Sequence, residues 1–306
     1  MKRLVIATRG SELAVWQANY IKGLIENKYK DIEVVLKKIK TQGDKILDVP
    51  LAKIGGKGLF VKEIEEALLN KDADIAVHSM KDVPIELPAG LEIFVTPKRE
   101  EPNDAFLSVK YSSLEELPEN AVVGTSSLRR KLQLLKLRSD LIVKDLRGNV
   151  NTRIRKMLEG NFDAIILAKS GLKRLNLTEH IKETVPMDKI LPAVCQGILG
   201  IEVRSDDSKT KEIISFINDK ETMIRAKCER AFLRGLQGGC QVPIAGYSEI
   251  IGGKIYLKSL LSSLDGKKHL FVEGEDEIDN FEKLGERNAE KILKSGGKEI
   301  LEEVYS

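Results

Sequence analysis

Basic and hydroxyl side chains gather where predicted β-strands give way to helices. Arg9 and Ser11 follow one short apolar run, and Lys81 follows another. Two later junctions carry the same residue types: Thr125, Ser127, Arg129 and Arg130 at the first, and Arg147 with Arg153 at the second. The carboxyl ends of parallel strands meet at one sheet edge, where open α/β proteins bind ligands. Hydroxyls, helix N-terminal amides and Arg forks bind anions there, which predicts a small molecule bearing several carboxylates.

Each junction also has an ordinary explanation. Ser and Thr are common helix N-caps, and Arg is common at protein surfaces. The repetition favours a functional cause, because a basic residue at a helix start opposes the helix dipole. A further Gly-rich turn at 55–58 opens a predicted helix but lacks the spacing of a nucleotide-binding loop.

Asp82 is the acidic residue within this basic set. A carboxylate among cations stays ionised, and it can stabilise a positive intermediate or exchange a proton with an amine. A helix cap or a structural salt bridge explains Asp82 equally well. Asp145, which precedes Arg147 by two positions, is a weaker candidate for the same role.

The three cysteines occupy different settings. Cys240 lies between Gly239 and Gln241 in a glycine-rich segment, which predicts an exposed thiol that could be a nucleophile or an attachment point. Cys228 has helical spacing to apolar residues and is expected to be buried, whereas the setting of Cys195 favours neither state. The three histidines are scattered and form no ligand motif, so we predict no metal site.

Alternation of short β-branched runs with amphipathic stretches predicts parallel α/β units that would position these residues. The predicted strands are 4–7, 34–39, 75–78, 91–96, 122–124, 141–144 and 164–168, and the predicted helices are 12–28, 59–70, 128–137 and 150–158. A turn-rich segment at 97–103 indicates a boundary or hinge. After Asp219 the pattern changes to a small α+β domain, with strands at 244–251, 254–261 and 269–272 between helices at 221–236 and 281–295.

Length and composition limit the class of protein. A chain of 306 residues suggests two or three domains. A net charge of +3 and an aromatic content of 5% argue against a nucleic-acid binder. No run approaches the ~20 apolar residues of a membrane helix, and the N-terminal apolar run is too short for a signal peptide. We therefore expect a soluble, cytoplasmic protein.

Several of these segments, taken in order, resemble the hydroxymethylbilane synthase family, also called porphobilinogen deaminases. The resemblance covers essentially the whole chain and is carried by residues 7–9, 50–60, 78–84, 124–130, 146–150, 171–175 and 239–243. Small departures are Gly10, where Gln is common, and Cys195, where a small residue is expected.

The resemblance implies three domains, the first two similar to the lobes of type II periplasmic binding proteins and the third of α+β type. Their expected bounds are 1–98 with 198–218 for domain 1, 99–197 for domain 2 and 219–306 for domain 3. It also implies a monomer with no membrane or nucleic-acid partner.

The resemblance further implies a dipyrromethane cofactor joined to Cys240 by a thioether. Four porphobilinogen molecules would be added in turn, each losing ammonia, before hydrolysis releases hydroxymethylbilane. Asp82 would stabilise the positive azafulvene left by loss of ammonia.

The remaining roles also follow from the resemblance. The cofactor would be held by Lys81, Thr125, Ser127, Arg129, Arg130 and Arg147; the substrate and growing chain by Arg9, Ser11, Arg147, Arg153 and Arg174; and Lys57 and Phe60 would lie on a mobile loop. A two-lobed carboxylate-binding protein without catalysis is the alternative, and it leaves Asp82 and Cys240 unexplained.

Overall fold

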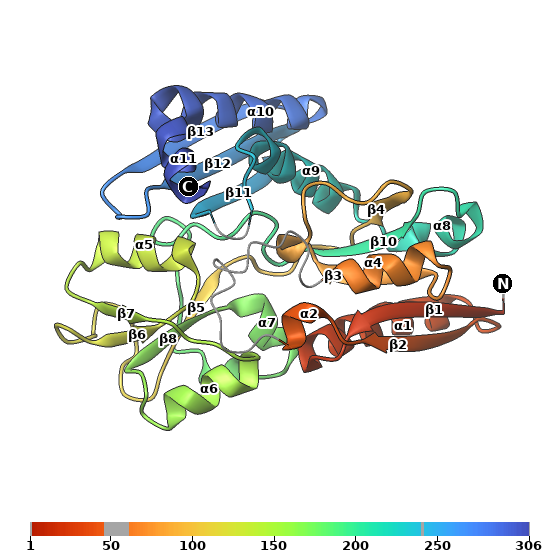
Figure 1. Cartoon of the computed structure of the whole chain (residues 1–306), viewed down its shortest axis with the longest axis horizontal. Helices are drawn as coiled ribbons and strands as arrows, with labels where there is room; N and C mark the ends of the chain where they lie inside the picture. The colour runs from red at the N-terminus through yellow and green to blue at the C-terminus, as the bar shows by residue number, and fades with distance from the viewer. Residues whose placement is uncertain (1, 46–60, 240–241, 306) are drawn as a thin grey trace. The chain divides into compact units, whose positions relative to one another are not determined.

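The computed structural model describes residues 2–45, 61–239 and 242–305, and the chain forms two compact units (Figure 1). The first unit comprises Met1–Glu100 with Gly197–Met223, and the second comprises Glu101–Gln196 with Ile224–Ser306. The chain therefore leaves the first unit near the turn-rich segment predicted as a boundary and returns to it about a hundred residues later.

A five-stranded sheet of order β2-β1-β3-β10-β4 forms the centre of the first unit. Its strands are β1 (Arg3–Arg9), β2 (Glu33–Ile39), β3 (Ile75–Ser79), β4 (Leu91–Val95) and β10 (Leu199–Arg204). β1 pairs in parallel with β2 and β3, whereas β10 lies antiparallel between β3 and β4. The parallel pairs place the carboxyl ends of β1 and β3 at one edge of the sheet.

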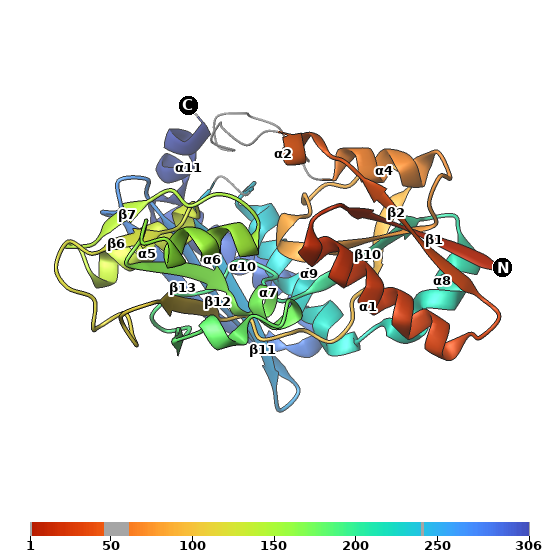
Figure 2. The same ribbon diagram turned by 90° about the horizontal axis from the view of Figure 1, so that it is seen from below.

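Helices cover both faces of this sheet (Figure 2). Ile21 of α1 (Glu12–Lys28) and Ile214 of α8 (Ser208–Ile214) pack on the face that carries Ile6 and Val77. On the other face, Ile64 and Leu68 of α4 (Lys62–Leu69) pack against Ala7 and Ala76. The short elements of the unit are α2 (Gln42–Lys45), η1 (Met80–Asp82) and η3 (Ser215–Ile217).

The second unit repeats the same strand arrangement in a sheet of order β7-β6-β8-β5-β9. Its strands are β5 (Asp104–Ser108), β6 (Val122–Gly124), β7 (Ile142–Lys144), β8 (Ala164–Ala168) and β9 (Glu183–Thr184). β6 is parallel to β7 and β8, and β5 lies antiparallel beside β8. Its helices are α5 (Leu128–Leu137), α6 (Val150–Leu158), α7 (Lys169–Arg174) and η2 (Thr178–His180).

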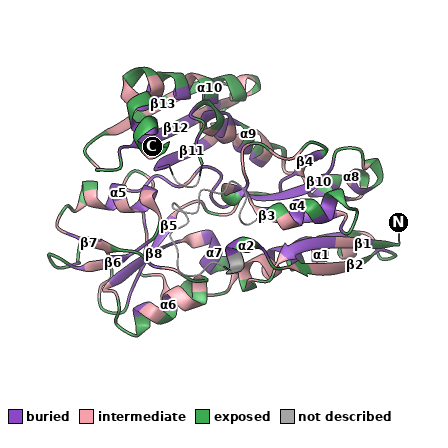
Figure 3. Ribbon diagram, in the orientation of Figure 1, coloured by how far each residue is buried: buried purple, intermediate pink, exposed green. Residues whose placement is uncertain are grey.

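Alternating side chains of the second sheet supply two separate cores. Leu134 of α5 packs with Phe106 and Ile166, whereas Ile154 of α6 packs with Leu107, so the two helices lie on opposite faces. Figure 3 shows the central strands of both sheets as buried.

A three-stranded antiparallel sheet follows, with strands β11 (Ile244–Ile251), β12 (Lys254–Ser262) and β13 (His269–Glu277). Its helices are α9 (Lys220–Gly235), η4 (Ile278–Asn280), α10 (Phe281–Ile292), η5 (Leu293–Gly297) and α11 (Lys298–Tyr305). Helix α10 packs against β12 and β13. Gly285 of α10 allows a close approach to α9, because a Cβ there would lie 2.4 Å from the carbonyl oxygen of Cys228.

This architecture confirms the predicted α/β class with a small α+β part. The sequence analysis missed three strands, β5, β9 and β10, all of which are antiparallel to their neighbours. The predicted helix at 281–295 ends where expected, because Gly296 adopts a φ of 100°, but the sequence analysis missed α11, which follows it. Division of the chain into three domains stays a prediction.

Candidate functional site

A pocket in the first unit contains three of the predicted residues. Arg9, Ser11 and Asp82 line it together with His78 and Ser79. Arg9 ends β1, Ser11 opens α1, and Asp82 lies in the 3-10 turn that follows β3. The parallel pairing of β1 with β3 thus brings a guanidinium, a hydroxyl and a carboxylate to one place.

Local hydrogen bonds shape the walls of this pocket. The Ser11 hydroxyl caps α1 by accepting from the Ala14 amide at 3.3 Å. The Gln17 side chain donates to the Ser79 hydroxyl at 2.8 Å and ties α1 to the end of β3. Ser79 directly precedes the turn with Lys81 and Asp82, so Gln17 helps to fix the start of that turn.

In the second unit, the loop after β6 is ordered by its own hydroxyls. The buried Thr125 accepts from the Ser127 amide at 3.2 Å, and Ser127 caps α5 by accepting from the Arg130 amide. Both predicted residues therefore lie at the N-terminus of a helix, where unpaired amides favour an anion.

Arg129 and Arg130 meet around a buried carboxylate that the sequence analysis did not identify. Nη2 of Arg129 donates to Oδ2 of Asp104 at 2.9 Å, and Nη2 of Arg130 donates to Oδ1 at 2.8 Å. Gln196 donates to the same Oδ1 at 2.8 Å, and Asp104 itself is fully buried. The two guanidinium groups hold the pKa of Asp104 well below its usual range despite burial.

This cluster carries one negative charge for two positive ones. The Nε atoms of Arg129 and Arg130 are buried and have no hydrogen-bond partner among the residues that the structure describes. Burial lowers the pKa of Arg129, in spite of Asp104. A further anion at this place would reduce the imbalance.

The other predicted arginines lie in the same unit. Nε of Arg153 donates to the Gly148 carbonyl at 2.8 Å, which holds the Arg153 side chain against the loop that contains Arg147. Asn149 caps α6 between them by accepting from the Thr152 amide. Arg174 is buried at the end of α7.

Three predicted residues, Cys240, Lys57 and Phe60, lie outside the described residues. Of the other two cysteines, Cys228 is buried as expected, and burial raises the pKa of its thiol. Cys195 is also buried and adopts a φ of 60°, a conformation that favours glycine. Its buried thiol is a poor candidate for attachment of a cofactor.

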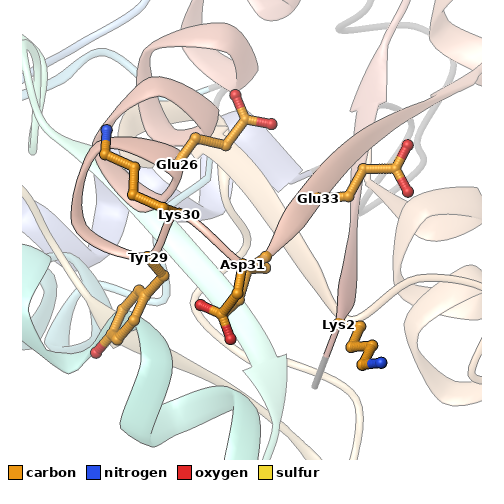
Figure 4. A pocket seen from close by; sticks show the side chains of 7 residues that line it. Lys2, Glu26, Tyr29, Lys30, Asp31 and Glu33 are labelled. Carbon is orange, nitrogen blue, oxygen red and sulfur yellow. The ribbon is translucent and has the colours of Figure 1, made fainter.

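A second hollow in the first unit lies at the turn between α1 and β2, where the side chains of Lys2, Glu26, Tyr29, Lys30, Asp31 and Glu33 line it (Figure 4). It contains none of the predicted residues. Within the described part of the chain, no cluster of three His, Cys, Asp or Glu side chains could hold a metal. No helix there has the length and apolarity needed to cross a bilayer.

Comparison with known proteins identifies the family. Residues 4–212 match the family model described as porphobilinogen deaminase, dipyromethane cofactor binding domain, and residues 223–294 match porphobilinogen deaminase, C-terminal domain. A curated porphobilinogen deaminase from Maridesulfovibrio salexigens is 53% identical over 305 residues, with 100% of this chain and 99% of that protein covered. Another, from Nitratidesulfovibrio vulgaris strain DP4, is 54% identical over 308 residues, with 100% and 98% covered.

A distant structural likeness accompanies these matches. A periplasmic substrate-binding protein of an ABC transporter from Coxiella burnetii shares 14% identity at a TM-score of 0.45, over 72% of this chain and 94% of its own. The two family models, by contrast, account for most of the chain, and relatives of 53% and 54% identity match it from end to end. The chain therefore belongs to the porphobilinogen deaminase family.

Proposed function

We propose that this protein is a hydroxymethylbilane synthase, a transferase that joins four porphobilinogen molecules head to tail and releases hydroxymethylbilane by hydrolysis. Family membership supports the reaction class. The observation that carries the proposal in the structure is the pocket that unites Arg9, Ser11 and Asp82. Arg9 and Ser11 can donate hydrogen bonds to the carboxylates of a substrate. The carboxylate of Asp82, in the same pocket, can exchange a proton with the substrate's amine.

The described residues fit the dipyrromethane that the matched family model names. Its carboxylates would supply the negative charge that the cluster of Arg129, Arg130 and Asp104 lacks. We assign Lys81, Thr125, Ser127 and Arg147 to the same cofactor, and its covalent attachment to Cys240.

When bound, the dipyrromethane supplies the primer to which the first ring is joined. In each addition the substrate's carbon–nitrogen bond breaks, ammonia leaves, and a carbon–carbon bond forms as the attacked pyrrole loses a proton. Asp82 stabilises the cation left by loss of ammonia, and its carboxylate can carry a proton at that position. Arg9, Ser11, Arg153 and Arg174 bind the carboxylates of the incoming ring and the growing chain.

The proposal also covers the location of the protein, its oligomeric state and the role of Lys57 and Phe60. We propose that it acts in the cytoplasm as a monomer, and that Lys57 and Phe60 belong to a loop that covers the bound substrate. A carboxylate-binding protein without catalysis would use the same arginines, but it has no need of Asp82 or Cys240.

The test combines intact mass with product formation. The purified chain should exceed its sequence mass by two pyrrole units, and the excess should be absent from Cys240→Ser. With porphobilinogen, the wild type should release ammonia and hydroxymethylbilane. Asp82→Asn should keep the mass excess and lose turnover by roughly two orders of magnitude or more, because it lacks an ionised carboxylate.

Three results would contradict the proposal or one of its assignments. An unmodified chain that gains no mass from porphobilinogen but still binds it would be a binding protein. A Cys240→Ser chain that retains the adduct would place the attachment at another residue. Near-normal turnover of Asp82→Asn would remove Asp82 from the mechanism.

A further inference from the structure

Three ionisable side chains are buried beside the pocket and take no part in the reaction described above. Nε2 of His78 lies 2.9 Å from Oε2 of Glu202, and both side chains are almost fully buried. Glu65, on α4, is 7% exposed. His78 itself lines the pocket with Arg9 and Asp82.

Strand alternation explains why these side chains meet. Glu202 of β10 pairs with Ala76 of β3, and Ala76 packs on the face that α4 covers. His78 is two residues beyond Ala76 and therefore lies on that same face. Glu65 approaches from α4, which packs against both β3 and β10.

Glu65 holds its proton more tightly than an exposed carboxyl group does. Oε1 of Glu202 is buried with no hydrogen-bond partner among the described residues. Burial and the charge of Glu202 raise the pKa of Glu65 to about 7, although His78 acts in the opposite direction. Two buried carboxylates beside a single imidazole favour retention of a proton by one of them.

Other charged groups also lie on the elements that pack around Glu65. Arg204 of β10 donates to the Leu68 carbonyl and to Asp207, and Glu92 of β4 pairs with Lys211. The further charged residues on α4 and β1 are Lys62, Glu63, Glu66, Arg3 and Arg9. Of these, Glu66 also raises the pKa of Glu65, and Arg9 lines the pocket.

We propose that Glu65, with the His78–Glu202 pair, sets the charge of the pocket that holds Arg9 and Asp82. While the cluster keeps its proton, the pocket accepts a substrate rich in carboxylates. Loss of the proton adds a buried negative charge next to the pocket and weakens that binding. Glu65 thus acts on the substrate indirectly, through the charge that it places beside the pocket. The inference rests on the proposed function for the identity of the substrate.

The kinetic test compares two matched variants over pH 6 to 9. Glu65→Gln imitates the protonated side chain, whereas Glu33→Gln makes the same change at an exposed position of β2 that does not act on the pKa of Glu65. For wild type and Glu33→Gln, KM for porphobilinogen should rise roughly three- to tenfold above pH 7. For Glu65→Gln it should stay within about twofold, with kcat little changed. An equal rise in all three proteins would overturn the proposal.

A second measurement does not depend on enzyme activity. An infrared difference spectrum of the wild type should show a protonated carboxyl band at pH 6 that disappears by pH 8, and Glu65→Gln should lack it. Absence of that band from the wild type would also overturn the proposal. A chain without turnover at any pH would refute the proposed function, while the infrared result would still decide whether the cluster holds a proton.

Discussion

Asp104 is the residue whose loss should destabilise the second unit most. Asp104→Asn keeps the shape of the side chain but leaves Arg129 and Arg130 buried without a counter-charge. Breaking a buried ion pair in this way costs about 3 to 5 kcal/mol. Urea unfolding of the variant, in a Cys240→Ser background that excludes the cofactor, measures the loss.

Asp140 provides the matched control. It also pairs with an arginine of the second unit, Arg138, but the pair is partly exposed. Asp140→Asn should therefore cost less than about 1 kcal/mol. Because the pKa of Asp104 is lowered in the fold, its contribution is lost only as the pH falls below the usual carboxyl range. The difference between wild type and Asp104→Asn should then be constant from pH 5 to 8, and equal losses for both variants would contradict this account.

For single residues, the sequence indicated which residue types lie together at the strand ends but not which side chains form pairs. Arg129 and Arg130 are conspicuous because a helix start disfavours basic residues. Their partner Asp104 is 25 and 26 residues away along the chain, respectively, and Glu202 is 124 residues from His78. No local pattern links such positions, so the buried partners emerged only from the fold.

A substitution at Gly285 tests how closely helices α9 and α10 must approach each other. Gly285→Ala would place a methyl group 2.4 Å from the Cys228 carbonyl oxygen and 2.7 Å from the Phe232 amide, both of them backbone atoms of α9. Separation of α9 from α10 should cost about 1 to 3 kcal/mol. Thermal unfolding should show a clear decrease in Tm.

Gly23, inside α1, provides the control, because the same substitution is expected to increase the stability of the fold there instead of decreasing it. A Cβ at this position meets nothing within 4 Å. Gly23→Ala should therefore stabilise the chain by about 0.5 to 1 kcal/mol through helix propensity. A similar decrease in Tm for both variants would show that the α9–α10 contact is not what sets the cost at Gly285.

Elements governed by local patterns were predicted best. The bounds of α1, α5 and α6 agree with the sequence prediction, since each begins at a Ser or Asn cap and follows an apolar periodicity. β10 was missed as a strand because both of its neighbours, β3 and β4, come more than a hundred residues earlier in the chain. A strand defined by such distant partners has a weak local signal.

The residues predicted to bind the cofactor are distributed unequally between the two units. Thr125, Ser127, Arg129, Arg130 and Arg147 belong to the second unit, and Lys81 belongs to the first. With these assignments, binding of the cofactor should stabilise the N-terminus of α5 far more than it stabilises elements that carry none of the assigned residues, such as β2.

Hydrogen exchange of one chain in two states measures this distribution. Wild-type protein made in a host without porphobilinogen would be compared with the same protein after reconstitution, so that no substitution confuses the result. Exchange should slow at residues 125–131 and 147–150, less at 79–83, and not at all in β2. The first turn of α5 responds most because its amides lie at a helix N-terminus, where an anion is bound favourably. Uniform protection of both units, or no protection at α5, would mean that the cluster of Arg129, Arg130 and Asp104 has a purely structural role and does not bind the cofactor.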